Sequence, residues 1–566
     1  MSRVGSGKTR VGSFAPLGLS MVDMVVATLF MNILALALPL SLLQVYDRIV
    51  PNESRGTLLL LVLGIVVFIL FEVVLRIARA HVSGWVGARF EHAAGCAAMN
   101  RLLATPLMAY ERDGSGVHVE QMASLKTVKE FYAGQTALAL FDLPFILVFL
   151  TIIFLIGGQL VLVPIGVMGL FVVSAALGAW SLKKAIENQN TAQERRLNFT
   201  IEVLTGIHTI KSMAMEAVML RRYERLQEAC ARGDYDVGLN SNAGMALGGF
   251  FSQLTMVAVA SYGCLLVLGE EMTVGGLAAS TLLAGRTLQP LQKAVGMWSR
   301  YQTISLARKR LDRVFELPVE ERADQVELPA DAPGAVSLKD VSFRYAEHLP
   351  DLFRAVNVDA AAGECIGIAA SNGAGKSTLL GLIQGSLPAS GGAVLIDGRP
   401  VGEYTPDSLK HRVAYLPQEG ELFQGTLLEN ISMFNPALTD AAKRMAARLG
   451  LDEVVARMPL GYETRVGEGA YDALPAGIKQ RVAIARALVH EPRIVLFDEA
   501  NGAVDSAGDA YIRQVLDDLK GRCTIFLVTP RPSLLRIADR VFDLAEGTLT
   551  PRPTETASPA QGGGKP

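Results

Sequence analysis

The chain has 566 residues, enough for two or three domains of about 100–200 residues each. Half of the residues are hydrophobic and 19% are charged, an apolar excess that must lie out of water and that predicts membrane-spanning segments. The net charge of −2 provides no basic surface for nucleic acid, and the five scattered cysteines lack the spacing of a zinc site or a disulfide framework.

Six long apolar runs occupy the first half of the chain. They lie at 22–45, 57–76, 136–156, 159–182, 243–268 and 273–298, and about 20 apolar residues suffice to span the hydrocarbon of a bilayer. Glycines and Arg286 interrupt the last run, which favours a helix that lines a cavity. We therefore predict an N-terminal tail at 1–20 and an all-α transmembrane domain of six helices at 21–304.

The charge distribution predicts the orientation in the membrane. The two long connections, 77–135 and 183–242, carry most of the Lys and Arg of this half, which places both of them and the N-terminus in the cytoplasm. Their helical periodicity predicts that the membrane helices continue beyond the bilayer. Two acids, Glu72 and Asp142, are either functional or located where the helices leave the inner edge of the membrane.

The second half has a different character. A charged helical segment and a Pro/Ala-rich stretch form the expected linker, 305–334. Short apolar runs then alternate with helical segments over 335–550, which is typical of an α/β domain with a largely parallel sheet. The tail, 551–566, has the composition of a disordered segment.

The clearest motif of this half follows Ala370. It lies between an apolar strand at 365–369 and an apolar helix at 379–383, which is the context of a phosphate-binding loop. Its members are Ser371, Asn372, Gly373, Ala374, Gly375, Lys376, Ser377 and Thr378. Backbone N–H groups of such a loop surround phosphates, Lys376 reaches the β- and γ-phosphates, and Ser377 can hold Mg²⁺. Ala370 stands where the motif usually has glycine, which adds a Cβ at the first turn of the loop.

A second candidate strand, 493–497, ends in Asp498 and Glu499. Ligands bind at the carboxyl ends of buried parallel strands. Asp498 suits Mg²⁺ and Glu499 suits the attacking water, because phosphoryl transfer needs mainly positioning and charge neutralisation. The two motifs together predict an ATP–Mg²⁺ site.

The order of these motifs resembles that of the ABC transporters over nearly all of residues 20–550. Tyr345 resembles the aromatic residue that stacks on adenine, and Gln418 resembles the glutamine that contacts Mg²⁺ and the attacking water, beside Glu499. In the membrane half, 44–51 and 141–145 resemble bacterial type I secretion exporters, and 205–211 resembles the intracellular loop that docks on the partner's nucleotide domain.

This resemblance implies a half-transporter of the bacterial inner membrane with a cytoplasmic nucleotide domain. It would work as a dimer with a second half-transporter in the lipid bilayer, together with a periplasmic adaptor and an outer-membrane channel. From the net charge, we expect no nucleic-acid partner.

Two motifs depart from the family pattern. The signature, usually Leu-Ser-Gly-Gly-Gln and acting in the partner's site, reads Leu474, Pro475, Ala476, Gly477 and Ile478. The signature serine is therefore absent, and we expect Pro475 to be the first residue of a helix, where no N–H is needed. In the switch loop, Pro530 replaces the histidine of the family.

Three functional interpretations follow. We favour the catalytically weak subunit of a heterodimeric exporter that moves a polypeptide or another substrate out of the cytoplasm. The first alternative is a slow but competent homodimeric ATPase. The second is a nucleotide-binding regulatory membrane subunit that transports nothing itself. The sequence leaves the exported substrate open.

Overall fold

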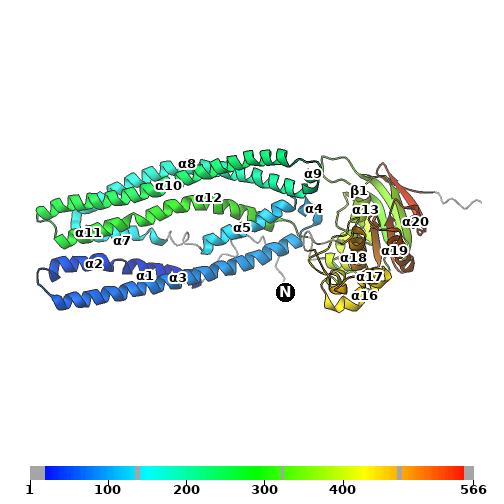
Figure 1. The fold of residues 1–566 in the computed structure, drawn as a ribbon, viewed down its shortest axis with the longest axis horizontal. Coiled ribbons are helices and arrows are strands. Elements are labelled where there is room, and N and C mark those ends of the chain that lie inside the picture. Colours follow the sequence, from blue (N-terminus) through cyan, green and yellow to red (C-terminus); the bar gives the residue numbers. More distant parts are fainter. Residues whose placement is uncertain (1–18, 134–140, 320–323, 468–473, 553–566) are drawn as a thin grey trace, which may run out of the picture. The chain divides into compact units, whose positions relative to one another are not determined.

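The computed structural model of the protein describes residues 19–133, 141–319, 324–467 and 474–552 (Figure 1). It divides the chain into a helical unit, Met1–Leu103 with Arg112–Leu317, and a second unit, Ala104–Glu111 with Pro318–Pro566. The second unit thus includes the short helix α4 (Leu107–Glu111), which lies in the first long connection of the sequence.

The helical unit is built from long helices. Its described elements are α1 (Leu19–Leu34), α2 (Ala37–Gln44), the π-helical turn η2 (Val45–Ile49), α3 (Arg55–Leu103), α5 (Ser115–Ala133), α7 (Phe145–Gly157), the 3₁₀ turn η3 (Gly158–Val161), α8 (Leu162–Thr205), α9 (Ile207–Ser212), α10 (Glu216–Leu268), α11 (Val274–Thr287) and α12 (Gln289–Glu316).

The predicted spans can be compared with these helices. Four described segments are long and apolar enough to cross a membrane: Val22–Ile49, Arg55–Leu103, Phe145–Thr205 and Glu216–Leu268. Five of the six predicted runs fall on them, although residues 136–140 of the third run lie outside the described residues. The sixth run falls on α11 and α12, which meet at Leu288. The outward faces are apolar, since Leu59, Leu60 and Phe71 of α3 each expose more than half of their surface.

Several helices extend well beyond the apolar runs, as predicted, because no proline interrupts the residues that adjoin those runs. α3 continues to Leu103, and α8 and α10 pair side by side in antiparallel register (Figure 1). Three polar pairs fix that register: Ser181 with Asn240, Gln189 with Asp234, and Arg196 with Gln227. α12 likewise continues to Glu316, past the domain end we expected at 304, so the charged segment assigned to the linker is the end of this helix.

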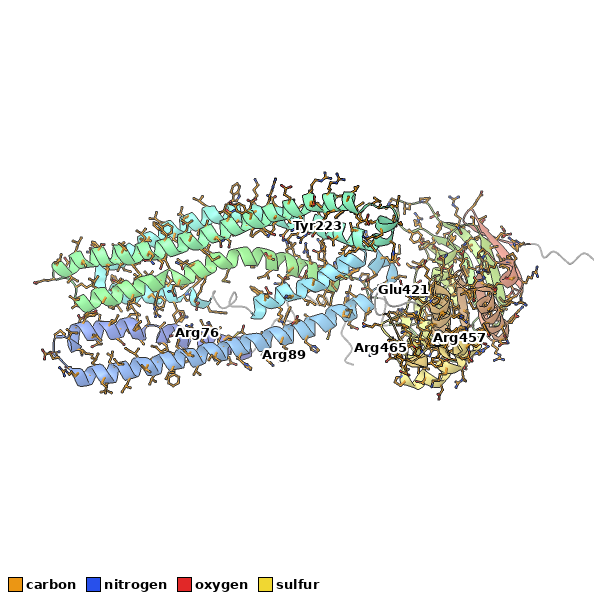
Figure 2. The ribbon with its side chains drawn as sticks, in the orientation of Figure 1. Arg76, Arg89, Tyr223, Glu421, Arg457 and Arg465 are labelled. Atoms are coloured by element: carbon orange, nitrogen blue, oxygen red, sulfur yellow. The ribbon has the colours of Figure 1, made fainter. Side chains whose placement is uncertain are left out.

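Both acids of the membrane half are paired. Glu72 accepts a hydrogen bond from Arg76, one turn later on α3, at 2.7 Å; Figure 2 labels Arg76 on this helix. Asp142 is buried and accepts hydrogen bonds from Asn32 Nδ2 at 3.0 Å and from Lys293 Nζ at 2.9 Å. Asp142 therefore links α1 to α12 through side chains that are 110 and 151 residues away from it in sequence.

The segment 44–51 contains the π-helical turn η2, and the acid of this turn caps another helix. Asp47 accepts hydrogen bonds from the Thr273 hydroxyl at 2.7 Å and from the Gly275 N–H at 2.9 Å, both at the start of α11. A Cβ at Gly275 would lie 2.5 Å from Asp47 Oδ1 and 2.7 Å from the carbonyl oxygen of Leu43. Only glycine allows this approach between η2 and α11.

The second unit contains two main sheets. The four-stranded sheet has the order β2-β1-β4-β5, and the six-stranded sheet has the order β12-β11-β3-β10-β9-β6. Their strands are β1 (Val336–Phe343), β2 (Phe353–Ala360), β3 (Cys365–Ala370), β4 (Gly391–Ile396), β5 (Arg399–Pro400), β6 (Val413–Leu416), β9 (Ile494–Asp498), β10 (Thr524–Val528), β11 (Arg540–Ala545) and β12 (Thr548–Pro551); β7 (Gly425–Thr426) and β8 (Arg465–Val466) form a separate pair.

The helices of this unit follow the strands. They are α13 (Lys376–Gln384), α14 (Pro406–Arg412), α15 (Leu427–Ile431), α16 (Thr439–Arg448), α17 (Leu451–Val455), α18 (Ala476–Leu488), α19 (Ser506–Leu519) and α20 (Pro532–Leu535). β9 is buried along its whole length, as expected for a central parallel strand, and its alternate side chains serve two cores. Leu496 packs with Leu379 of α13, whereas Phe497 packs with Val482 of α18.

The parallel strands place the predicted motifs together. β3, β10, β9 and β6 are neighbours and all run parallel. The loops that follow their carboxyl ends therefore meet at one edge of the sheet. These loops carry the phosphate-loop motif, the switch loop, the Asp498–Glu499 pair and Gln418, respectively.

Candidate functional site

The phosphate-loop motif has the backbone that its chemistry requires. Gly373 and Gly375 adopt left-handed φ values of +82° and +93°, and a Cβ at Gly375 would lie 2.9 Å from the Phe353 ring. α13 begins at Lys376, and no side chain caps its N-terminus, so its first backbone N–H groups can bind an anion. Ala370 ends β3 with ordinary strand geometry, so its Cβ causes no backbone strain.

Lys376 and Glu499 form an ion pair at the centre of this edge. Their side chains are 12% and 18% exposed, and Lys376 Nζ also lies 3.5 Å from the carbonyl oxygen of Ala370. Glu499 adopts a positive φ of +49°, and its N–H donates to the carbonyl of Val528 at 2.9 Å. Phosphate groups entering the loop must therefore take the Lys376 ammonium away from the Glu499 carboxylate.

Asp498 is held by a neighbouring tyrosine. The Tyr415 hydroxyl, on the adjacent strand β6, donates a hydrogen bond to Asp498 Oδ2 at 2.8 Å. Burial, followed by this contact with a carboxylate, raises the pKa of Tyr415 well above its usual range, so the phenol remains a donor. Sequence reasoning missed Tyr415, although it stands three residues before Gln418.

The residues around Asp498 suit Mg²⁺ bound together with a nucleotide. Among the described residues, no group of three His, Cys, Asp or Glu side chains could hold a metal ion without other ligands. Mg²⁺ at nucleotide sites needs only one or two carboxylates, with phosphate and water oxygens completing the shell. The Asp498 carboxylate and the exposed Ser377 hydroxyl, on the first turn of α13, are oxygen donors of this kind.

Tyr345 and Gln418 approach the edge from two other elements. Tyr345 Oη lies 2.7 Å from Thr378 Oγ1, and its ring packs edge-on against Phe343 with 49% of the residue exposed. The free half of the ring can stack on a base. Gln418 is exposed in the loop after β6, and buried Gln480 of α18 ties that loop down by donating to the Pro417 carbonyl at 2.7 Å.

Helix α18, which contains the signature, begins one residue later than predicted. Pro475 is the N-cap of α18 rather than its first residue, since its φ of −53° and ψ of 141° are not helical. Its carbonyl accepts from the N–H groups of Ile478 at 2.9 Å and Lys479 at 3.1 Å. No side chain caps this helix, because proline has no acceptor to replace the serine hydroxyl.

The rest of the signature packs on neighbouring parts of the unit. Leu474 is half-buried against the core, and Ala476 is exposed at the first position of α18. A Cβ at Gly477 would lie 3.0 Å from the carbonyl oxygen of Ala503 in the loop after Glu499. In the switch loop, Pro530 is exposed. Its neighbour Thr529 is buried, and Arg531 on its other side is half-buried.

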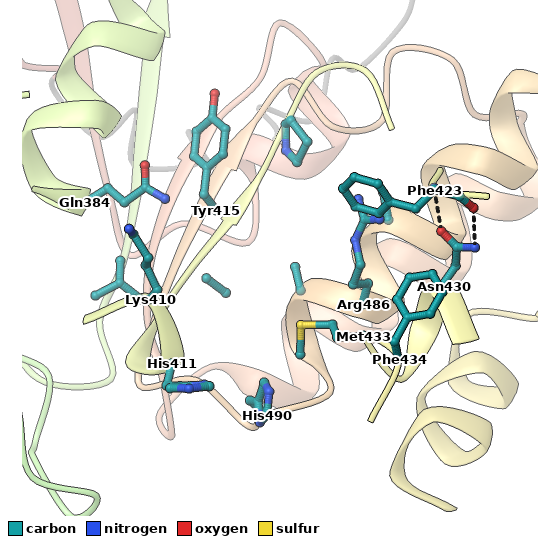
Figure 3. A pocket seen from close by; sticks show the side chains of 15 residues that line it. Gln384, Lys410, His411, Tyr415, Phe423, Asn430, Met433, Phe434, Arg486 and His490 are labelled. Atoms are coloured by element: carbon teal, nitrogen blue, oxygen red, sulfur yellow. Dashed lines mark hydrogen bonds between the residues drawn. The ribbon is translucent and has the colours of Figure 1, made fainter. Parts of the chain in front are cut away.

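A separate cavity of about 540 Å³ opens beside the Gln418 loop (Figure 3). Lys410, His411 and His490 lie on one side of it, and Phe423 and Phe434 lie on the other. The two imidazole rings contact each other edge to face at 4.8 Å. Burial, and then the neighbouring His411 and Arg412, lowers the pKa of His490 below its usual value. Phe423 is 62% exposed, so the cavity has an accessible apolar wall.

The fold and the site define a membrane protein with an attached ATPase of the ABC class. The family described as ABC transporter transmembrane region matches residues 21–291, and the family described as ABC transporter matches residues 353–502. The chain belongs to the ABC transporter family, with both regions fused in one polypeptide.

The chain is similar to several bacterial ATP-binding proteins of secretion and export. The chain is 29% identical over 531 residues to the cyclolysin secretion/processing ATP-binding protein of Bordetella pertussis, covering 93% of this chain and 74% of the relative. It is 28% identical over 530 residues to the leukotoxin export ATP-binding protein of Aggregatibacter actinomycetemcomitans, with coverages of 93% and 74%. It is also 28% identical over 531 residues to the alpha-hemolysin translocation ATP-binding protein of Escherichia coli O157:H7, with coverages of 94% and 75%.

A solved structure shares the fold. A bacterial Atm1-family ABC exporter with ATP bound superimposes with a TM-score of 0.81 at 23% identity, covering 94% of this chain and 95% of that one. The predicted fold class, the ABC transporter ATPase and the membrane-spanning exporter domain are therefore confirmed.

Proposed function

We propose that the chain is the catalytically weak half of a heterodimeric type I secretion exporter. One observation carries the proposal: the elements that build the ATP site are intact, while two groups that act on the γ-phosphate in this family are replaced. Pro475 with Ala476 replaces the signature serine and glycine, and Pro530 replaces the switch histidine.

The chain's own site retains the groups for binding nucleotide. In this proposal the adenine stacks on Tyr345, the loop from Ser371 to Thr378 surrounds the phosphates, and Ser377, Asp498 and Gln418 hold Mg²⁺. The ion neutralises phosphate charge when it is bound. Glu499 and Gln418 orient the attacking water after Lys376 has moved from Glu499 to the phosphates.

The location of the missing groups favours a heterodimer. Each composite site of such a dimer combines the phosphate loop of one chain with the signature of the other. In a homodimer both sites lack the histidine and the serine, and losing one preorganised group of this kind costs about 10²–10³ in rate. The two losses do not add independently when the groups act as a unit. With a partner that has typical motifs, each site loses only one group. This chain's own site lacks the switch histidine, and the partner's site lacks the signature serine.

The relatives support polypeptide export, because their names refer to the secretion or translocation of cyclolysin, leukotoxin and alpha-hemolysin. By analogy, a periplasmic adaptor and an outer-membrane channel complete the path from the inner membrane.

The N-terminus and the nucleotide domain lie in the cytoplasm, according to the distribution of Lys and Arg. The partner's intracellular loop docks in the cavity beside Phe423. The exposed Phe423 ring gives this cavity an apolar wall, against which a short helix of the loop can be buried.

The test is steady-state ATPase activity of the purified chain in lipid. We compare the wild type, Glu499→Gln, and a restored variant that combines Pro475→Ser, Ala476→Gly and Pro530→His. The proposal expects nucleotide binding with little turnover in the wild type, and at least a tenfold gain in the restored variant that Glu499→Gln abolishes. Appreciable wild-type turnover that Glu499→Gln abolishes would instead establish a competent homodimer.

A second readout separates the regulatory alternative. The native chain is purified from membranes of its source and its associated proteins are identified. Co-purification of a different half-transporter with intact motifs supports the heterodimer. ATP-dependent export that persists without the chain would show that it transports nothing.

A further inference from the structure

The residue after the substituted switch position joins two loops of the ATPase unit. Arg531 Nη1 donates to Asp509 Oδ1, on the first turn of α19, at 2.9 Å. Arg531 Nη2 lies 3.4 Å from the carbonyl oxygen of Val504, in the loop 499–505. The guanidinium therefore connects the switch loop after β10 to the loop after β9, which we name the D-loop segment.

The bridge is partly buried, with the Arg531 side chain 36% exposed, and both of its ends make further contacts. The Asp509 side chain is 16% exposed, and the same oxygen accepts a second hydrogen bond from buried Asn501 Nδ2 at 2.8 Å. The N–H of Arg531 donates to the hydroxyl of buried Thr529 at 3.2 Å. Charge-assisted hydrogen bonds are about twice as strong as neutral ones, so this contact can hold a loop in position.

The D-loop segment carries this restraint to the signature helix. Ala503 presses against α18, where a Cβ at Gly477 would lie 3.0 Å from its carbonyl oxygen and 3.5 Å from the Cα of Val504. Val504 is 5% exposed and fits closely against α19, where a Cβ at Gly508 would lie 2.3 Å from Val504 Cγ1. Because packed backbone cannot move independently of its neighbours, a shift of Val504 must also shift the start of α18.

We propose that Arg531 is a positioning residue for the ATPase reaction. It holds the D-loop segment and the first turn of α18 in one arrangement, and it does not replace the absent imidazole of position 530. Its guanidinium is committed to Asp509 and Val504, so it reaches the reaction only through the loop that it holds. The effect of Arg531 on a partner's ATP site, through the signature on α18, rests on the proposed function. The restraint inside this chain does not depend on it.

The test measures amide hydrogen exchange by mass spectrometry on the full chain in lipid nanodiscs. Arg531→Ala removes the bridge, and we expect at least tenfold faster exchange in peptides covering 501–505 and 474–480. Exchange in 376–383, on α13, serves as the internal reference and should stay unchanged. Arg531→Lys keeps the charge but offers no planar fork, so we expect partial protection.

Two further variants make the result specific. Arg448→Ala breaks a comparable 2.9 Å pair with Asp518 on the surface of the same unit, and it should leave 501–505 unchanged. Asp509→Asn should reproduce the effect of Arg531→Ala without adding to it in the double variant. If Arg531→Ala does not fold, the Asp509→Asn variant provides the readout.

The outcomes separate positioning from general stability. Nucleotide affinity of the chain's own site should stay within twofold in Arg531→Ala, while turnover of the restored variant described above falls. Unchanged exchange at 501–505 would overturn the proposal, and so would faster exchange that is equal throughout the unit. Because exchange needs neither hydrolysis nor a partner, failure of the heterodimer proposal leaves this result unaffected.

Discussion

Replacing Glu499 by glutamine should strengthen nucleotide binding while abolishing hydrolysis. The Lys376–Glu499 ion pair must break when phosphates enter the loop, and both side chains are less than one-fifth exposed. A charge-assisted hydrogen bond contributes about 1.5–3 kcal/mol and a neutral one about 0.5–1.5 kcal/mol. The glutamine amide therefore lowers the cost of freeing Lys376 by about 1–1.5 kcal/mol, which is about tenfold in Kd.

ADP is the ligand for this assay, because it lacks the γ-phosphate that the ATPase removes. Titration of a fluorescent ADP analogue into the chain in nanodiscs at low salt gives Kd for the wild type and Glu499→Gln. Asp518→Asn is the matched control, since its pair with Arg448 is exposed and such pairs contribute about 0–1 kcal/mol. An unchanged or weaker affinity in Glu499→Gln would show that the ion pair does not compete with phosphate.

Three other predictions concern stability, measured by thermal unfolding of the full chain in detergent. Gly275→Ala should destabilise the protein strongly, because its Cβ would lie 2.5 Å from the Asp47 carboxylate; Gly166→Ala, with nothing within 4 Å, should be neutral or stabilising by about 0.5–1 kcal/mol. Asp142→Asn should cost roughly 1–3 kcal/mol by leaving its lysine partner unpaired, less than a fully buried pair because that lysine is 56% exposed. The lowered pKa of His490 means that the unfolded chain binds more protons, so stability should fall as pH drops below 6.5, and His490→Gln should flatten that dependence.

Each of these would be contradicted by a specific result. Equal stabilities of the two alanine variants would show that η2 and α11 separate without cost. A double variant of Asp142 and Lys293 that is as unstable as Asp142→Asn alone would show that the unpaired lysine is not the cause. A pH profile unchanged by His490→Gln would assign the titration to other groups.

The parts of the protein that could be read from sequence depend on local patterns. An apolar run of bilayer length predicts a span whatever surrounds it, and β9 reads as a continuous apolar run because it is buried on both faces. Gly373 and Gly375 predict the phosphate loop because the left-handed backbone there requires glycine.

The residues at which helices begin and end were less well predicted, because the local sequence there is compatible with more than one limit. α12 runs to Glu316 because neither glycine nor proline interrupts 297–317, and the charged helical segment that we assigned to the linker forms its last turns. Pro475 became an N-cap rather than a first helical residue because proline accepts both an extended and a helical ψ.

Only the tertiary structure decided which side chains meet. Tyr415 reaches Asp498 across 83 residues of sequence because β6 lies beside β9, and Asp142 meets Lys293 of α12 across 151 residues. Arg531 finds Val504 because β10 lies beside β9. Residue type and spacing along the chain fix neither strand order nor helix packing, since both depend on how distant apolar faces are buried against each other.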